Sequence, residues 1–364
     1  MNEMDGTSGL DDPVRAWEES LCGARVLVTG GAGFVGSWVS ERLLDAGAQV
    51  WIVDNLLTGT ADKIEHLFGR PGFAITIADA SHSIPDPGGV DVVMHLACPA
   101  SPAHYQRLPL ETLRVASEGT VNALELAARH GARFVLASTA DVYGEPEVHP
   151  QREEYWGHVN PIGVRSVYDE GMRFAEATTM AYARERGVDV GVARLFNTYG
   201  PRMSLDDGRV VPAFLNQALS GAPLTVAGDG SQTRSLCWVE DTVEGLLRLA
   251  CADVAGPINI GSDHEVTMLE LARTIIELTG SESRIHHVAL PADDPHVRRP
   301  DLTRARLLLG WEPEMQLEEG LKRTALWMEE TRSSREQAGR SYAPPRNLSC
   351  PAASPKVLAG TDGE

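Results

Sequence analysis

Short apolar runs alternate with helical patterns along most of the chain. Six of the runs are continuous rather than alternating, which is typical of strands covered on both faces. They are RVLVTG (25–30), AQVWIVD (48–54), FAITIAD (73–79), VDVVMHLA (90–97), RFVLAST (133–139) and DVGVARLF (189–196). Helical patterns separate them over residues 34–46, about 109–130 and about 166–186. This alternation predicts right-handed crossovers and an α/β fold with a doubly wound parallel sheet.

The pattern changes after Asn197, where proline, glycine and loop-like stretches become frequent. The elements predicted there are short strands at 223–228 and 258–262 and helices near 210–220, over 240–252, over 268–280 and over about 317–331. Thr267 suits the N-cap of the third of these helices, and Gly280 suits its end. We expect a smaller C-terminal α/β lobe that closes over one end of the sheet.

These patterns divide the chain into two domains and two tails. The expected large domain covers 21–200 and is rejoined by 236–256, and the smaller lobe covers 201–235 and 257–332. Residues 1–20 are polar and acidic, and residues 333–364 are rich in Pro, Ser, Gly and Ala. We expect both ends to be disordered tails because neither has a sustained apolar period.

The composition is typical of a globular protein, and its net negative charge argues against binding to nucleic acid or anionic membranes. Hydrophobic residues make up 43% of the 364, enough for a sizeable core. Lys and Arg number 32 against 51 Asp and Glu, and the formal charge of −19 should repel nucleic acid and anionic membranes. An anionic ligand would therefore have to be met by a few local arginines, which makes the arginine positions informative.

The cysteines and the start of the chain bear on the compartment. Five widely spaced cysteines without a C-x-x-C pair argue against a disulfide framework or a metal site, and favour a reducing compartment. The first residues show no signal peptide, and no apolar stretch reaches the roughly 18 residues that span a membrane. We expect a cytoplasmic protein that binds no metal.

A glycine motif lies between the first strand and the first helix. Gly30, Gly33 and Gly36 form G-x-x-G-x-x-G, which permits a tight turn and a close approach of a pyrophosphate to the start of a helix. Asp54 ends the next strand, where a carboxylate can bind the ribose hydroxyls of an adenosine and would repel a 2′-phosphate. An ordinary turn would explain the glycines alone, but the full order of elements predicts a Rossmann-like NAD site.

A second group of residues suits proton transfer. Ser138 and Thr139 end the strand at 133–139, and Tyr168 and Met172 lie four apart on the following helix, so they share one face. A strand-end hydroxyl beside a helical tyrosine can relay a proton while hydride moves to or from NAD. A lone tyrosine is more often a core or surface residue, and the glycine motif upstream favours the catalytic interpretation.

At this point the chain resembles the extended short-chain dehydrogenase/reductases and, among them, the UDP-glucuronate decarboxylases (UDP-xylose synthases). The resemblance covers about residues 24–330. The blocks GGAGFVGS, VDNLLTG, HLACPASPAHY, ARLFNTYGPRM and PLTVAGDGSQTRS fit, and the narrower signals are PEVHPQREEYWGHVNPIG, YDEG and DDPHVRRPD. Nucleotide-sugar epimerases and 4,6-dehydratases share the fold but not those narrower blocks.

The resemblance implies a reaction in which NAD acts as a bound catalyst. NAD oxidises the 4-hydroxyl of the sugar of UDP-glucuronate, and the 4-keto group then lies β to the carboxylate. Carbon dioxide leaves because the ketone stabilises the resulting enolate. Protonation at carbon 5 and return of the hydride give UDP-xylose. Relatives also pair the helices near 109–130 and 166–186, so we expect a homodimer in which Leu113, Leu124, Leu126, Met172, Phe174 and Met180 lie on the paired faces.

The resemblance also assigns residues. Tyr168 is the base for the 4-hydroxyl, Thr139 is its hydrogen-bonding partner, Asp141 takes the place of the family's acidic residue, and Arg298 holds the glucuronate carboxylate or assists protonation at carbon 5. The expected cofactor-binding residues are Gly30, Gly33, Phe34, Val35, Asp54, Asn55, Thr58, Gly59, Asp79, Ala80, Leu96, Cys98, Tyr168 and Thr198. The expected substrate-binding residues are Pro99, Tyr105, Arg114, Asn197, Arg209, Val211, Thr225, Gln232, Arg234 and Arg298.

Three positions depart from the family pattern. Met172 replaces the lysine of Y-x-x-x-K, Asp141 after Ala140 replaces a longer Glu after Ser, and Ala116 replaces an Asn. The lysine normally lowers the pKa of the tyrosine and binds the nicotinamide ribose, and methionine supplies no charge. Arg165 or Arg173 could reach in to replace it.

These departures leave three hypotheses open. The first is an active decarboxylase that releases UDP-xylose, UDP-4-keto-xylose or both. The second is a catalytically silent protein that binds NAD and a nucleotide sugar. The third is a related nucleotide-sugar epimerase or dehydratase.

Overall fold

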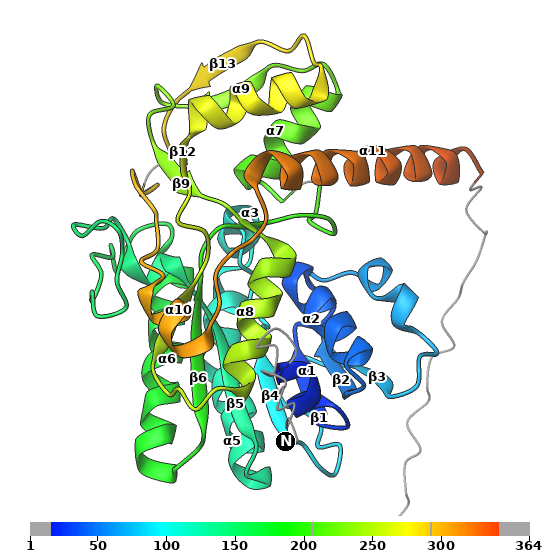
Figure 1. Cartoon of the computed structure of the whole chain (residues 1–364), viewed down its shortest axis with the longest axis vertical. Coiled ribbons are helices and arrows are strands. Elements are labelled where there is room, and N and C mark those ends of the chain that lie inside the picture. The colour runs from blue at the N-terminus through cyan, green and yellow to red at the C-terminus, as the bar shows by residue number, and fades with distance from the viewer. Residues whose placement is uncertain (1–15, 206, 292, 342–364) are drawn as a thin grey trace, which may run out of the picture.

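A seven-stranded parallel sheet forms the centre of the molecule (Figure 1). The computed structural model of the chain describes residues 16–205, 207–291 and 293–341. The strand order is β11-β6-β5-β4-β1-β2-β3, and every neighbouring pair is parallel. The strands are β1 (Arg25–Thr29), β2 (Gln49–Asp54), β3 (Phe73–Ile77), β4 (Val92–His95), β5 (Arg133–Thr139), β6 (Val190–Leu195) and β11 (Pro257–Ile260). The six strands predicted from the apolar runs are confirmed.

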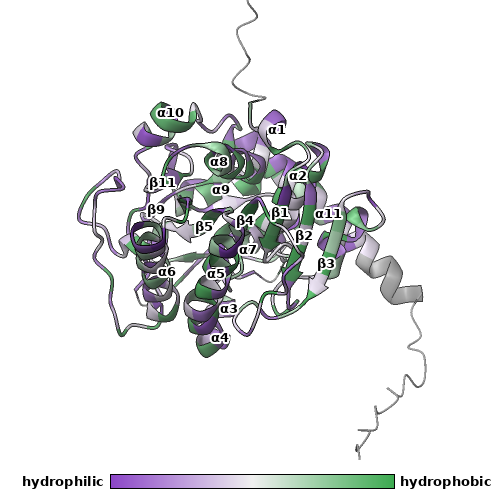
Figure 2. Ribbon diagram, turned by 90° about the horizontal axis from the view of Figure 1, so that it is seen from below, coloured by the Kyte–Doolittle hydropathy of each residue, from purple (hydrophilic) through white to green (hydrophobic). Residues whose placement is uncertain are grey.

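Helices cover both faces of this sheet, which is why the strands are apolar on both sides (Figure 2). One face carries α1 (Ala16–Leu21), α2 (Phe34–Asp45), α8 (Val239–Cys251) and α10 (Thr303–Leu309). The other carries α4 (Pro109–Arg114), α5 (Thr120–His130) and α6 (Ser166–Arg186). A π-helical segment, Val115–Gly119, joins α4 to α5 within the single long helix that we predicted. The doubly wound α/β fold is confirmed.

A smaller α/β lobe lies beyond the carboxyl ends of the strands (Figure 1). It contains α7 (Val210–Leu219), β8 (Leu224–Ala227), α9 (Met268–Thr279), β13 (Ile285–Val288) and α11 (Leu317–Ser341). Helix α9 begins with a capping box, in which Thr267 and Glu270 each bond the other's backbone N–H, and it ends at Gly280. Two short strand pairs connect the lobe to the sheet: β7 (Thr198–Tyr199) with β10 (Cys237–Trp238), and β9 (Thr233–Ser235) with β12 (Glu265–Thr267).

Three expected boundaries need correction. Residues 257–260, which we assigned to the smaller lobe, form β11 and pair with β6 at the edge of the large sheet. Residues 16–20, which we assigned to a tail, form most of α1, because Trp17 and Leu21 are buried against α8. Residues 333–341 continue α11. The rest of the expected tails, 1–15 and 342–364, lies outside the described residues.

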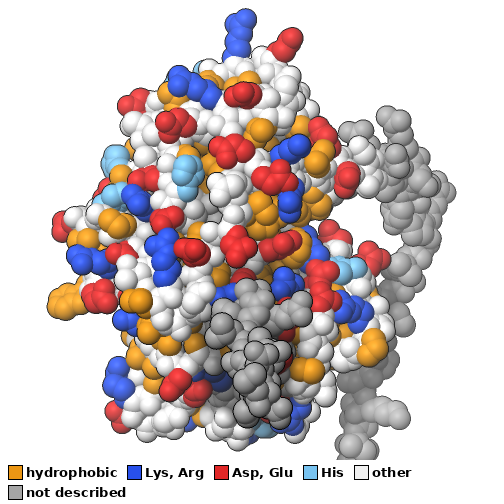
Figure 3. Space-filling view, viewed as in Figure 1, with side chains coloured by type: hydrophobic (Ala, Val, Ile, Leu, Met, Phe, Trp, Pro, Cys, Tyr) orange, Lys and Arg blue, Asp and Glu red, His pale blue; other side chains and the backbone are white. Residues whose placement is uncertain are grey.

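The surface is polar and mixed in charge on the face seen in Figure 3, where acidic and basic side chains alternate over both lobes. None of the helices in the described part of the chain combines the length and the apolar character needed to cross a bilayer.

Candidate active site

A cavity of about 550 Å³ lies where the carboxyl ends of the strands meet the smaller lobe. A second cavity of about 80 Å³ adjoins it toward β2 and β3. The two share the residues Gly30, Gly33, Thr58, Leu96 and Cys98. This is the end of an open parallel sheet at which ligands of α/β proteins bind.

The glycine motif forms a tight loop with no room for side chains at Gly30 and Gly36, which we call the glycine cradle. Gly30 has a φ of +71°, and a Cβ there would lie 2.8 Å from the backbone of Ala97. A Cβ on Gly36 would collide with the carbonyl oxygen of Gly30. Helix α2 begins directly after Gly33, and its first residues, Phe34, Val35 and Gly36, line the larger cavity. The loop therefore fits the pyrophosphate of a dinucleotide at a helix N-terminus.

Asp54 lies buried at the end of β2 and lines the smaller cavity. Its carboxylate accepts hydrogen bonds from the backbone N–H groups of Ala32, at 2.9 Å, and Leu56, at 2.8 Å. Burial raises the pKa of Asp54, and these two bonds oppose the rise. Each carboxylate oxygen keeps a second lone pair for a ribose hydroxyl. The residues present thus fit the adenosine half of NAD.

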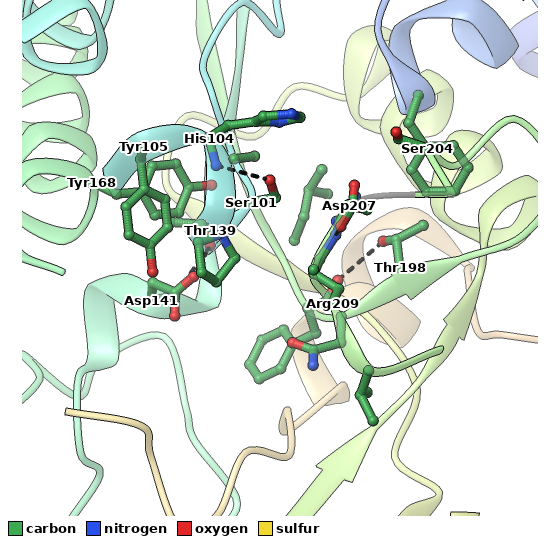
Figure 4. A pocket seen from close by; sticks show the side chains of 18 of the residues that line it. Ser101, His104, Tyr105, Thr139, Asp141, Tyr168, Thr198, Ser204, Asp207 and Arg209 are labelled. Carbon is green, nitrogen blue, oxygen red and sulfur yellow. Dashed lines mark hydrogen bonds and ion pairs between the residues drawn. The ribbon is translucent and has the colours of Figure 1, made fainter. Parts of the chain in front are cut away.

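Tyr168 lies on the wall of the larger cavity formed by α6 (Figure 4). Its ring stacks on Tyr105 from α3 (Pro102–Arg107), with centroids 5.3 Å apart and planes 4° from parallel. Burial raises the pKa of Tyr168 well above its ordinary value, and the nearby Thr139 hydroxyl offsets only part of this rise. Within the described chain, the Tyr105 hydroxyl is buried without a hydrogen-bond partner. Both phenols therefore lie where a bound sugar could be contacted.

Asp141 joins the tyrosine side of the cavity to the smaller lobe. Its Oδ1 accepts hydrogen bonds from Arg298 and, at 2.8 Å, from Arg165. Its Oδ2 accepts one from Thr139 at 3.2 Å. Burial alone would raise the pKa of Asp141, but the two guanidinium groups outweigh it and hold that pKa well below its usual range. Asp141 is therefore ionised at neutral pH.

The comparison with known proteins agrees with this geometry. The model of the NAD dependent epimerase/dehydratase family matches residues 26–261. The chain belongs to this family. UDP-glucuronic acid decarboxylase 2 of Arabidopsis thaliana is 52% identical over 82% of this chain and 67% of its own length. UDP-glucuronic acid decarboxylase 6 of the same plant is 49% identical over 86% and 91%.

Solved structures of the family share the fold. An epimerase from Methanothermobacter thermautotrophicus is 30% identical, has a TM-score of 0.81, and is matched over 89% of this chain and 98% of its own. Together with the curated relatives, it confirms the epimerase/dehydratase fold and the resemblance to UDP-glucuronate decarboxylases. The cofactor of the family is NAD, and the glycine cradle and Asp54 fit it.

Most of the expected site residues of this epimerase/dehydratase family member meet in the two cavities. All fourteen expected cofactor-binding residues line one or both of them. The expected substrate-binding residues that line the larger cavity are Tyr105, Asn197, Arg209, Thr225, Gln232, Arg234 and Arg298. Pro99 lines the smaller cavity instead.

Two expected substrate-binding residues line neither cavity. Arg114 is exposed in the last turn of α4, because the helix turns this position away from the sheet. Val211 is buried in α7 within the apolar core of the smaller lobe. Three charged residues outside the expected site lists also line the larger cavity and pair with its other charged groups. They are Arg165, which we considered only as a substitute for the lysine, and Asp207 and Asp294. The DDP in the narrow family block was the one available signal, for Asp294.

Met172 lies one turn beyond Tyr168 and is 3% exposed. It belongs to the same apolar cluster as Ala116, the other position at which the resemblance implies a polar residue. Arg165 pairs with Asp141 and Asp294, and Arg173 bonds the backbone carbonyls of Val142 and Trp156. The expectation that one of these arginines replaces the lysine is therefore not supported by their contacts.

Asp169, next to Tyr168, is a buried carboxylate whose Oδ1 has no hydrogen-bond partner in the described part of the chain. Burial raises its pKa to about 7, with a further contribution from Asp141. Folding therefore favours the protonated form, and stability falls as the pH rises from the unfolded pKa near 4 to about 7. We expect Asp169→Asn to raise the melting temperature by a few degrees at about pH 8 and to change it little at about pH 4.

Calorimetry at the two pH values checks this expectation. Glu170→Gln is the matched control, because Glu170 is the adjacent carboxylate on the outer side of α6 and pairs with Arg173. An equal effect of Asp169→Asn at both pH values would show that the carboxylate is not protonated in the folded protein.

Proposed function

We propose that the protein decarboxylates UDP-glucuronate with NAD as a bound, regenerated cofactor. The observation that carries the proposal is the meeting of Tyr168, Thr139, Asp141 and Arg298 in one cavity. These residues come from α6, from the end of β5 and its following turn, and from the segment after β13. Curated relatives that are about half identical over most of the chain are named as UDP-glucuronic acid decarboxylases.

Oxidation at carbon 4 of the sugar needs a hydride acceptor and a base. NAD, when bound, accepts the hydride and later returns it. Tyr168 is the base for the 4-hydroxyl proton, and Thr139 orients the phenol. Because burial raises the pKa of the phenol, nearby positive charge is needed to favour its ionised form. Arg209 lies close enough to lower the pKa of Tyr168, although less than burial raises it.

Recognition of the anionic substrate depends on arginines that are already paired with carboxylates. Arg298 bonds Asp141 and the carbonyl oxygen of Gly144, and it is buried. Arg234 bonds Asp294, at 2.9 Å. The carboxylates of Asp141 and Asp294 therefore hold the guanidinium groups of Arg298 and Arg234 in place before any ligand binds. A bound glucuronate carboxylate would share or replace the Asp141 contact, and the diphosphate would meet Arg209 and Arg234.

Loss of carbon dioxide then follows from the substrate's own chemistry. A ketone at carbon 4 stabilises the enolate left when the carboxylate on carbon 5 departs. The enolate takes a proton at carbon 5, and re-reduction at carbon 4 gives UDP-xylose. Where re-reduction does not follow, UDP-4-keto-xylose is released, the hydride stays with the cofactor, and NAD is not regenerated in that turnover.

A direct assay tests the proposal. Purified protein is incubated with UDP-glucuronate, and the nucleotide products and released carbon dioxide are followed by mass spectrometry. We expect UDP-xylose, its 4-keto form or both. An isomer of unchanged mass would identify an epimerase, and loss of water would identify a dehydratase.

One observation favours a second candidate function, that of a binding protein without turnover. Met172 and Ala116 place apolar groups where the family has a lysine and an asparagine, and Tyr168 has a raised pKa. This candidate predicts that NAD and UDP-glucuronate bind while the sugar stays unchanged. The same incubation, with binding measured by calorimetry, separates the two.

We also propose a homodimer formed through α4 and α6, which lie side by side. Leu110 is 64% exposed there and Phe174 is 50% exposed. The expected contribution of Leu124, Leu126 and Met172 needs correction, because all three are buried in the core of their own chain.

The free cysteines of the described residues support the further proposal of a reducing, cytoplasmic compartment.

Light scattering at micromolar concentration should give the mass of a dimer, and Phe174→Asp should give that of a monomer, because a charge would replace a large apolar contact. Leu307→Asp is the control, since Leu307 is exposed on α10, on the opposite face of the sheet. A monomeric wild type would contradict the proposal.

A further inference from the structure

Lysine is rare in this protein, and its position is therefore informative. The chain has only Lys63, Lys322 and Lys356 among 32 basic residues. Lys322 is exposed on α11, and Lys356 lies outside the described residues. Lys63 ends a short 3₁₀ helix, Ala61–Lys63, and is the one lysine of the described chain that lines the larger cavity.

The ammonium of Lys63 is partly removed from water, and no partner for it lies among the residues that the structure describes. Within the described residues its side chain makes no hydrogen bond and no ion pair shorter than 4.0 Å. Burial lowers the pKa of Lys63, and the attraction of Asp62, Asp207 and Asp54 only partly opposes this. Arg209, by contrast, is already neutralised by Asp207. A half-buried cation without a partner is suited to an anion supplied from outside the chain.

The two cavities indicate which part of a ligand Lys63 would meet. The smaller cavity carries Asp54 and suits the adenosine, and the larger cavity carries Tyr168 and suits the nicotinamide. A dinucleotide that occupies both must place its pyrophosphate where they join, beside Gly33. Lys63 lines the larger cavity together with Gly33 and Phe34, at the start of α2.

We propose that Lys63 binds the pyrophosphate of NAD and holds the cofactor in place. Lys63 supplies a positive charge from the segment after β2, whereas Met172 on α6 supplies no positive charge to the site. The proposal rests on the NAD-binding part of the proposed function and not on decarboxylation. The diphosphate of the substrate has the same chemistry, so the test must separate the two sources.

Trace acetylation of the full-length protein, freed of nucleotide and read by mass spectrometry, provides the test. NAD far above its Kd should slow the acetylation of Lys63 by at least about tenfold, because a pyrophosphate covers the amine. Lys322 serves as the internal reference, and its rate should not change. UDP alone should leave Lys63 as reactive as in the free protein. Equal reactivity of Lys63 with and without NAD, or full protection by UDP alone, would overturn the proposal.

Affinity measurements give an independent readout that needs no turnover. Lys63→Gln should raise the Kd for NAD by about tenfold or more and leave the weak binding of adenosine unchanged, because adenosine has no pyrophosphate. Lys63→Arg should retain most of the affinity, and Lys322→Gln should bind NAD as the wild type does. An unchanged Kd in Lys63→Gln would contradict the proposal. Because no sugar substrate is used, failure here is distinguishable from failure of the decarboxylase assay.

Discussion

Replacing Met172 by lysine should make 4-hydroxyl oxidation faster at neutral pH and move the rising limb of its pH–rate profile to lower pH. Burial raises the pKa of Tyr168 well above its ordinary value, so only a small fraction of the phenol is ionised near pH 7. In the wild type the rate should therefore keep rising beyond neutrality. An ammonium one helical turn away favours the phenolate, and each unit of lowered pKa gives about ten times more phenolate at pH 7.

The surroundings of Met172 decide how this variant is designed. The side chain is buried in an apolar cluster that includes Ala116, so a lysine there also loses hydration. Ala116 packs against Gly171, the neighbour of Met172 on α6. The double variant Ala116→Asn/Met172→Lys supplies an amide and should gain more than the single variant.

Single-turnover absorbance of the reduced cofactor measures the first step. Met172→Gln is the uncharged control and should leave the pH limb in place. An unchanged limb in Met172→Lys would mean that another group already performs the task of the lysine. Loss of all activity with NAD still bound would show that the site is built around the thioether.

Replacing Arg298 by alanine should slow decarboxylation by at least about 30-fold while NAD remains bound. Arg298 is buried beside Asp141, and it is the arginine that the resemblance assigns to the glucuronate carboxylate. Without it, the substrate carboxylate and Asp141 would face each other, and of the two guanidinium groups bonded to Asp141 only that of Arg165 would remain. A lost partner of a buried charge costs about 2–5 kcal/mol, which corresponds to a rate loss of roughly 30-fold to several thousand-fold.

Two further variants make the Arg298 result interpretable. Arg298→Lys keeps the charge but loses the planar pair of donors, so it should retain part of the activity. Arg306→Ala removes an arginine that pairs with Asp263 and Glu312 outside the cavities, and it should behave as the wild type. Near-normal turnover in Arg298→Ala, with bound NAD unchanged, would show that another residue holds the carboxylate.

The core of the fold was predictable because it depends on local patterns. Strands buried on both faces must be continuously apolar, and the glycine motif needs only a strand, a turn and a helix in order. Strand β11 was misplaced because four residues carry little pattern, and only its pairing with β6 reveals its sheet. Helix α1 was missed because its stability comes from Trp17 and Leu21 packing on α8, more than 200 positions away.

The site was predictable residue by residue but not as a network. Tyr168, Thr139 and Asp141 lie in recognisable blocks. The charge network around Asp141 joins partners that are 24 and 157 positions away, and no spacing rule connects such distances. Arg114 was expected to bind substrate but lines neither cavity, because a motif fixes a position along a helix and packing decides which way that position faces. Lys63 lies in none of the recognised motifs, and only the structure shows that it lines the larger cavity.

We propose that one protein oxidises, decarboxylates and re-reduces the same sugar. Substrate labelled with deuterium at carbon 4 and carbon-13 in the carboxylate follows each step in one mass-spectrometric measurement. We expect release of labelled carbon dioxide and UDP-xylose that keeps its deuterium, with any 4-keto product lacking it. Unlabelled carbon dioxide, or recovery of UDP-glucuronate with both labels while NAD and substrate are bound, would contradict it.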